Sequence, residues 1–238
     1  MKIEALIDQG WKSYLNKVSS NLLYPENEKM MQLQLAQIFQ TLAPIYEYER
    51  SESIKVLLEV PATINNSVNR IIDIVISHEI ESEIHQYPIE LKCFRLFSRN
   101  STKKRGAQNL GMYDYWEDIE NIEGYSELIN FRKGFQLTLT DDPYYVTTEH
   151  KGAQVKVYST NESRNDVTGV LEEPIKNRQG RIELKGTYSM SGWQNIGDFY
   201  FISQVTKNAS SAPLKIVNAV PIAATVITPP FIIPILAR

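Results

Sequence analysis

A chain of 238 residues can bury roughly 70–75% of the surface that it exposes when unfolded, so neither a disulfide nor a structural metal is needed to stabilise it. Its single cysteine, Cys93, excludes an intramolecular disulfide, and a net charge of −3 argues against a surface that is basic throughout. The N-terminal stretch MKIEALIDQGWKSYL has no apolar signal core. We therefore expect a cytoplasmic protein of one large domain or two small ones.

The first two predicted elements are amphipathic helices. Residues 4–18 place apolar side chains at helical intervals on one face. A turn at Tyr24-Pro25 precedes a second helix over residues 26–42. The apolar stripe of this helix consists of Met31, Leu35, Ile38 and Leu42. Glu28 lies on the same side as the stripe, where an acid is either a first-turn partner of the helix dipole or a residue of a functional site.

Three strands are expected next. Residues 53–60 (SIKVLLEV) predict the first, and residues 61–66 predict a turn. Residues 71–76 and 88–94 have the length and the β-branched content of buried strands, and a polar loop joins them as a hairpin. The order of elements is then a helix followed by three strands.

Three charged residues interrupt these apolar strands. Asp73 lies in the second strand, and Glu90 and Lys92 lie on one face of the third, because side chains alternate along a strand. The same alternation places Leu91 and Cys93 on the opposite face, so Cys93 is expected in the core. Buried charges are normally paired or bound to a metal. The strands therefore form either a salt-bridged pair without catalysis or a site where Asp73, Glu90 and the carbonyl of Leu91 bind Mg²⁺.

The order Asp73, then Glu90-Leu91-Lys92, resembles the D…(D/E)xK signature of the PD-(D/E)XK, or restriction-endonuclease-like, nuclease superfamily. The leading proline of that signature is absent, and Ile72 stands in its place. The resemblance implies phosphodiester hydrolysis with Mg²⁺, for which Mn²⁺ is expected to substitute. The ion would lower the pKa of its water, and Lys92 would position that water or stabilise the transition state.

The resemblance also implies a fourth catalytic residue. Many members of the superfamily carry a glutamate on the helix before the first strand, and this glutamate points at the metal. Glu28 is the candidate for this auxiliary acid, and Glu26 is the alternative.

A basic run follows the third strand directly. Residues 92–105 carry six bases and no acid, whereas residues 106–131 carry six acids and no base. The bases are Lys92, Arg95, Arg99, Lys103, Lys104 and Arg105. Those after Lys92 are expected to bind the phosphates of a substrate, the alternative being a charged run that is only solvated.

Residues 106–123 predict a helix whose buried stripe contains aromatic residues, while Asp114, Glu117 and Asp118 are expected to face out. Part of the superfamily has a Gln and a Tyr one helical turn apart after the ExK strand, where they hold the DNA and the site. Gln108 and Tyr113 resemble this pair, although they are five positions apart where that branch usually has four. The alternative places Tyr113 in the core and Gln108 on the surface.

The remaining chain is expected to add strands. Residues 135–140 (FQLTLT) predict a strand that lies beside the ExK strand, and residues 153–158, 180–190 and 198–205 read as further strands. A rival to the first site, Asp166 with Glu183 and Lys185, repeats its spacing, but Asp166 lies in a loop-like context, SRNDVTG.

The uncharged, apolar tail at 216–237 contains four prolines, which disfavour a membrane-spanning helix. It is expected to lie on the domain or on a partner, and a homodimer contact is one option.

Taken together, these patterns predict an α/β fold in which helices flank a central mixed sheet, with a restriction-endonuclease-like core of order α-β-β-β-α-β. Residues 1–148 would form this core with its N-terminal helices, and residues 149–238 a β-rich C-terminal extension with the apolar tail. The expected activity is Mg²⁺-dependent endonucleolytic hydrolysis of DNA, with a restriction or defence role. The alternatives are a nuclease-like fold that only binds nucleic acid and a protein-interaction domain.

Overall fold

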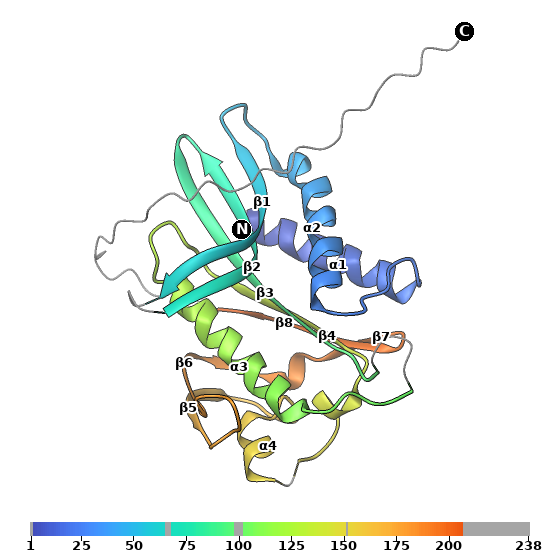
Figure 1. Cartoon of the computed structure of the whole chain (residues 1–238). Helices are drawn as coiled ribbons and strands as arrows, with labels where there is room; N and C mark the ends of the chain where they lie inside the picture. Colours follow the sequence, from blue (N-terminus) through green and yellow to red (C-terminus); the bar gives the residue numbers. More distant parts are fainter. Residues whose placement is uncertain (1, 65–67, 98–101, 151, 207–238) are drawn as a thin grey trace.

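The computed structural model describes residues 2–64, 68–97, 102–150 and 152–206 (Figure 1). The helices are α1 (Lys2–Ser19), α2 (Glu28–Leu42), α3 (Gln108–Tyr125) and α4 (Ala153–Tyr158), with short 3-10 turns at Ala43–Tyr46, Pro143–Tyr145 and Met190–Gly192. The strands are β1 (Ser53–Ile64), β2 (Val68–Ile80), β3 (Glu83–Phe94), β4 (Phe135–Thr140), β5 (Val167–Glu172), β6 (Arg181–Tyr188), β7 (Gln194–Ile196) and β8 (Phe199–Val205). Within these residues, no helix combines the length and the apolar character needed to cross a membrane.

The fold is α/β, with a mixed six-stranded sheet in the order β1-β2-β3-β4-β8-β7. Strands β1, β2 and β3 form an antiparallel meander, and β4 returns through α3 to lie parallel to β3. Strand β8 pairs antiparallel with β4, and β7 forms the edge. The predicted mixed sheet between helices is confirmed, as is the position of the 135–140 strand beside β3. The division after residue 148 stays a prediction, although β7 and β8 share the sheet with β1–β4.

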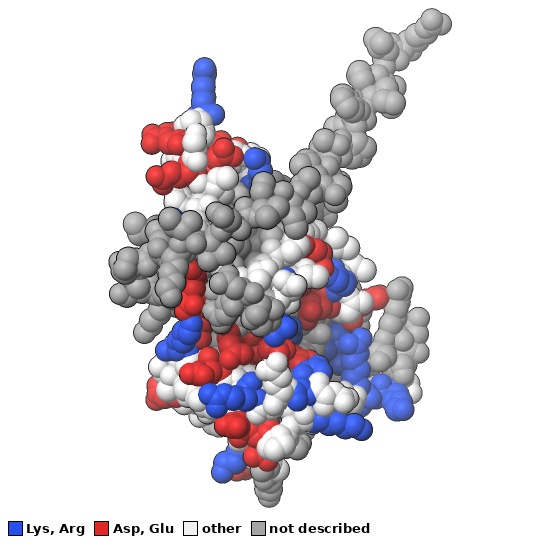
Figure 2. Space-filling model, turned by 60° about the vertical axis from the view of Figure 1, so that its left-hand side comes forward, with Lys and Arg blue, Asp and Glu red and all other residues white. Residues whose placement is uncertain are grey.

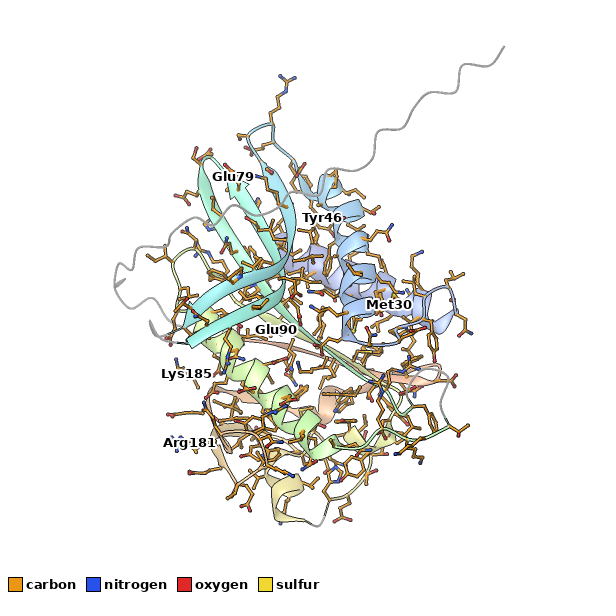
Figure 3. All side chains as sticks on the ribbon, in the orientation of Figure 1. Met30, Tyr46, Glu79, Glu90, Arg181 and Lys185 are labelled. Atoms are coloured by element: carbon orange, nitrogen blue, oxygen red, sulfur yellow. The ribbon has the colours of Figure 1, made fainter. Side chains whose placement is uncertain are left out.

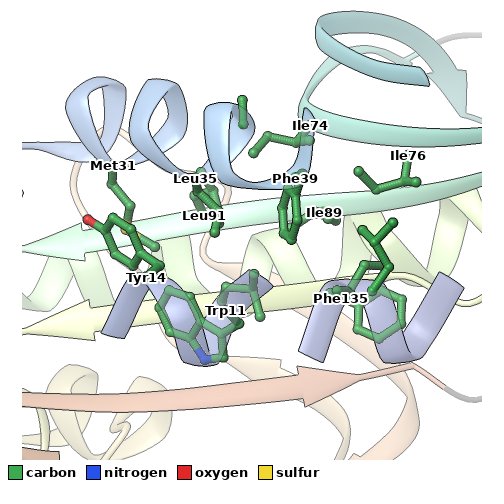
Figure 4. Close-up of a cluster of buried hydrophobic side chains, with 14 of the residues drawn as sticks. Trp11, Tyr14, Met31, Leu35, Phe39, Ile74, Ile76, Ile89, Leu91 and Phe135 are labelled. Atoms are coloured by element: carbon green, nitrogen blue, oxygen red, sulfur yellow. The ribbon is translucent and has the colours of Figure 1, made fainter. Parts of the chain in front are cut away.

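One face of the sheet packs on α1 and α2 (Figure 4). Leu91 and Cys93 of β3 belong to this core, as their alternation along the strand predicts. Helix α2 begins after Asn27, whose side chain accepts a hydrogen bond from the N–H of Met30 at 2.9 Å. This bond satisfies one of the backbone N–H groups that have no partner within the first turn of the helix. This cap places Glu28 in the first turn of α2.

The other face of the sheet packs on α3, which is also covered by the separate β5-β6 sheet and by α4. Residues 153–158 were expected as a strand and are instead the helix α4, so this prediction is wrong. Six residues with alternating valines suit either structure, and tertiary contacts decide: Tyr158 is buried against Tyr113, and its carbonyl accepts from Trp116 Nε1 at 3.0 Å.

Two predicted boundaries also need correction. The predicted turn at 61–66 starts too early, because β1 runs to Ile64 and its end packs on α3. The predicted polar loop of the hairpin is mostly strand, and the reversal occurs at Glu81 and Ser82, which both have positive φ. His78 and His85 therefore lie in paired strands rather than in a loop.

Candidate functional site

The site lies at a fork in the sheet. The β2–β3 ladder extends from Ile80 and Glu83 down to Ile74 and Ile89. Past this point β2 continues alongside β1, whereas β3 continues alongside β4, so the two central strands separate. Asp73 and Glu90 are the next residues on the two strands. They face each other where the backbone pairing stops.

A pocket of about 230 Å³ opens at this fork. Its lining comes from α2, β2, β3 and α3, and it consists of Glu28, Arg70, Ile71, Asp73, Glu90, Lys92, Glu117, Asp118, Asn121 and Tyr125. The four residues predicted as catalytic, Asp73, Glu90, Lys92 and Glu28, are thus brought together. Segments far apart in the sequence meet here.

Asp73 is fixed through both its side chain and its backbone. Its Oδ2 accepts a hydrogen bond from the N–H of Leu91 at 2.9 Å, which replaces the missing ladder bond at the fork. Its carbonyl accepts from Nε2 of the buried Gln32 at 2.6 Å, and the same amide donates to Glu59 on β1. Glu59 lies opposite Asp73 with a φ of 53°, a left-handed conformation that is uncommon for a residue with a side chain. The backbone irregularity thus falls at the site.

Glu90 is the most deeply buried carboxylate of the pocket, with 5% of its surface exposed. Tyr125 of α3 donates to its Oε1 at 3.0 Å. Figure 3 shows Glu90 in the interior, beside β3 and α3. Burial, together with the charges of Asp118 and Asp73, raises the pKa of Glu90 well above its usual value.

Lys92 lies between acids from two helices. Its Nζ is 2.5 Å from Oδ2 of Asp118 and 3.6 Å from Oε2 of Glu28, and it is 3.3 Å from the carbonyl oxygen of Leu91. Burial lowers the pKa of this amine, but the charges of Asp118 and Glu28 outweigh burial and hold it above the usual value. Lys92 therefore stays a cation and has no lone pair with which to accept a proton.

Three further carboxylates of the pocket, Asp73, Glu28 and Asp118, also resist ionisation. Burial raises the pKa of Asp73 and of Glu28, and it raises that of Asp118 to about 7 even though Lys92 opposes the change. Among the described residues that line the pocket there are five acids and two bases. Figure 2 shows acidic side chains gathered across the middle of the face turned forward, with basic side chains around them. Such an excess of acids favours the binding of a cation, which offsets the charge that the carboxyl groups gain when they ionise.

The donors at the fork fit a hard divalent cation. Over the residues that the structure describes, no three His, Cys, Asp or Glu side chains are arranged to hold a metal ion by themselves. The predicted site does not require three side chains, since it combines two carboxylates with the carbonyl of Leu91, and Mg²⁺ usually keeps several waters. Oxygen donors of this kind, in an acidic pocket, suit Mg²⁺ or Mn²⁺.

No family model, curated protein sequence or solved structure gives a significant match to the chain.

Arg95 is a structural residue, which argues against the predicted phosphate contact. Its guanidinium donates to Asp141 Oδ2 at 2.9 Å, to the hydroxyl of Tyr24 at 2.9 Å and to the carbonyl of Pro25, and it lies over the ring of Phe199. Only 8% of its surface is exposed. Arg95 joins the end of β3 to the loop before α2, and three of its N–H groups already donate to these partners.

The other predicted substrate contacts lie outside the pocket. Lys103 and Lys104 are exposed, and Arg105 is half-buried, on the loop before α3. Gln108 donates to the carbonyl of Arg105 at 3.0 Å, an interaction within that loop. Tyr113 is buried under β6, where its hydroxyl meets the carbonyl of Arg181 at 3.3 Å, so the core alternative is the correct one. Arg99 and the tail at 216–237 lie outside the described residues.

Most of the site residues that sequence reasoning missed lie on α3. Asp118 was expected to face solvent, yet it pairs with Lys92 in the pocket, so that expectation is wrong. Asp118, Asn121 and Tyr125 occur at helical spacing and form a polar stripe that faces the sheet fork. This spacing is the signal that could have indicated a third wall of the site. Arg70, three residues before Asp73, gave no such signal.

The rival pattern lies on the surface. Glu183 and Lys185 of β6 have side chains that are 63% and 60% exposed, and they pair with Arg181 and Glu127. Figure 3 shows Arg181 and Lys185 at the periphery. Their neighbours Ile182 and Leu184 fill the core instead. The second pattern is thus the outer face of an ordinary strand, as expected.

Replacing Glu90 by glutamine should stabilise the protein at high pH when no metal is present. The folded protein holds the Glu90 proton to a higher pH than the unfolded chain, so this carboxyl costs stability increasingly as the pH rises above its unfolded pKa. In EDTA, the Tm of Glu90→Gln should therefore equal that of wild type near pH 3.5, below the unfolded pKa, and exceed it by about 2–4 °C or more at pH 8, because a change of about 1 kcal/mol shifts Tm by that amount at this size.

The matched control is Glu183→Gln, the exposed glutamate of the rival pattern. It should leave the Tm unchanged at both pH values. A Glu90→Gln protein that is no more stable than wild type at pH 8, or equally stabilised at pH 3.5, would contradict the burial of an ionisable Glu90.

Proposed function

We propose that this protein is a metal-dependent nuclease that hydrolyses phosphodiester bonds of DNA with Mg²⁺. The observation that carries the proposal is the convergence of Asp73, Glu90 and Lys92 on one pocket at the fork between β2 and β3. A salt-bridged strand pair would need only balanced charge, whereas this pocket is lined by more acids than bases. That imbalance favours a cation-binding role for the acids.

The connectivity supports the same proposal. Elements α2, β1, β2, β3, α3 and β4 follow in the order α-β-β-β-α-β that the resemblance to the restriction-endonuclease-like superfamily implies. In this arrangement the acid of the second strand and the ExK residues of the third strand meet at the fork. DNA is the expected substrate because most of that superfamily cuts DNA, and a restriction or defence role follows from the activity. A homodimer stays a prediction.

Each residue of the pocket has a separate role in this proposal. Asp73, Glu90 and the carbonyl of Leu91 would hold Mg²⁺, for which Mn²⁺ would substitute. When bound, the ion supplies an acidic water and neutralises charge on the phosphate. Lys92 stays protonated and acts as a cation that stabilises negative charge in the transition state. Glu28, with Asp118, holds the Lys92 amine in place.

The test uses plasmid, linear duplex and single-stranded DNA incubated with Mg²⁺, with Mn²⁺ or with EDTA. We expect wild-type protein to cleave at least one substrate with either metal and none in EDTA. Asp73→Asn should reduce cleavage at least about a hundredfold, because loss of a metal ligand removes several kcal/mol of transition-state stabilisation. The matched control, Asp166→Asn in the rival pattern, should cleave like wild type. Undiminished cleavage by Asp73→Asn would move the site elsewhere.

Calorimetry with Mn²⁺ distinguishes the proposed nuclease from a non-catalytic domain with the same fold. The nuclease should take up Mn²⁺ with release of protons, because carboxylates with raised pKa values must ionise to bind a metal. A domain that binds DNA without taking up Mn²⁺ would favour the non-catalytic alternative.

A further inference from the structure

The pocket contains two basic side chains that differ in their access to solvent. Among the lining residues that the structure describes, Lys92 and Arg70 are the bases. The Lys92 side chain is 13% exposed, and it is already paired with Asp118 and Glu28. The Arg70 side chain is 34% exposed. An anion that arrives from solvent therefore meets Arg70 before it meets Lys92.

Arg70 is held in a defined position but not neutralised by a close partner. It lies on the part of β2 beyond the fork, where Arg70 pairs with Ala62 of β1. Its Nε donates to the neutral Asn121 Oδ1 at 3.1 Å, which orients the guanidinium. Its Nη2 lies 3.4 Å from Glu117 Oε1, longer than the 2.7–2.9 Å of a strong charge-assisted contact. These two contacts leave most of the five N–H donors of the guanidinium for a further partner.

A phosphate group is the partner that this geometry fits. A planar guanidinium can donate two parallel hydrogen bonds to phosphate oxygens, which an ammonium group does not match. The pocket repels anions while its acids are ionised and unneutralised, so a phosphate would enter only together with a divalent cation. Arg70 lies on the same strand as Asp73, at the wall where such a phosphate would face solvent.

We propose that Arg70 is a substrate-binding residue that contacts a non-bridging oxygen of a nucleic-acid phosphate, exchanging its weak contact with Glu117 for this one. The inference rests on the proposed nuclease function, and it assigns the phosphate contact to β2 rather than to the basic run after β3. Asn121 acts as a positioning residue for the guanidinium.

The chain offers a closely matched control. Arg178 pairs with Asp114, which lies on α3 as does Glu117, the partner of Arg70. Neither Arg178 nor Asp114 lines the pocket. The two arginine side chains are similarly exposed, 34% for Arg70 and 31% for Arg178. Replacing either one removes one positive charge and one partly exposed ion pair, so the effects on stability should be similarly small. Any difference in DNA binding between the two variants then reflects the location of Arg70 in the pocket.

The experiment measures binding of a short fluorescein-labelled DNA duplex by anisotropy, with Ca²⁺ in place of Mg²⁺ to limit cleavage, over a series of salt concentrations. Arg70→Ala should weaken binding about tenfold or more and should lower the slope of log K against log salt by roughly 0.9, the value for one lost phosphate contact. Arg178→Ala should leave both unchanged. Arg70→Lys, which keeps the charge, should retain the slope and lose part of the affinity, and it carries the test if Arg70→Ala folds poorly.

Two results would overturn the assignment of Arg70: wild-type affinity in Arg70→Ala, or equal weakening by Arg70→Ala and Arg178→Ala. Failure of the proposed function looks different, because the wild-type protein itself would then neither bind the duplex with Ca²⁺ nor cleave it with Mg²⁺.

Discussion

Lys92→Met should lower the rate of Mg²⁺-dependent DNA cleavage by about 10²–10³-fold, the effect typical of losing one preorganised charge in an active site. Methionine is unbranched and keeps most of the length of the side chain, but it removes the charge. Binding of DNA should change much less, since the amine is buried between Asp118 and Glu28 and does not face solvent. The measurement is a single-turnover cleavage assay beside an anisotropy titration of the same duplex.

The matched control is Lys185→Met, because Lys92 and Lys185 both end an IELK tetrapeptide. Lys185 is exposed and pairs with Glu127, so this variant should cleave at the wild-type rate. In Lys92→Met, Asp118 stays in the pocket without its cationic partner, so the Tm of this variant is recorded as well. Wild-type cleavage by folded Lys92→Met would refute a role for the amine, and equal losses in both variants would refute its location.

Arg95→Ala should destabilise the protein by about 3–5 kcal/mol, the usual cost of leaving the partner of a buried ion pair uncompensated. Asp141 would lose its charged partner, and the carbonyl of Pro25 would lose a donor. At about 2–4 °C for each kcal/mol, the Tm should fall by at least about 6 °C. Thermal unfolding followed by circular dichroism measures the change.

Lys104→Ala is the control, since Lys104 belongs to the same basic run but is exposed. Its Tm should match that of wild type. If Arg95 were instead a phosphate contact, Arg95→Ala would keep the wild-type Tm and weaken only DNA binding, the reverse of the result expected from its buried contacts.

Much of the site could be predicted from local sequence patterns. Alternation along a strand was enough to place Glu90 and Lys92 on one face and Leu91 and Cys93 on the other, and the structure agrees. The hairpin brought Asp73 opposite Glu90, because antiparallel register follows from short connections. The prediction that Glu28 faces the site came from the apolar stripe of α2, because Glu28 lies on the same side of the helix as that stripe.

Asp118 and Arg95 differ from expectation for the same physical reason, namely whether a charged side chain meets solvent or another layer of the fold. Asp118 and Arg95 each occupy a position that its local sequence marks as exposed. Asp118 is covered because α3 crosses the fork of the sheet, and Arg95 is covered because the loop before α2 folds over the end of β3. Both contacts join segments far apart in the chain.

By itself, the sequence determined the periodicity of most elements, the faces of the strands and the unusual presence of acids in apolar strands. Only the tertiary structure decided which of the two IELK strands carries a pocket. The first lies in the central sheet under α3, where its Glu is buried and the side chain of its Lys is only 13% exposed, and the second lies in a two-stranded sheet whose outer face meets solvent. The physical reason is that side-chain alternation fixes which residues share a face, whereas the burial that raises the pKa values of the acids depends on what packs over that face.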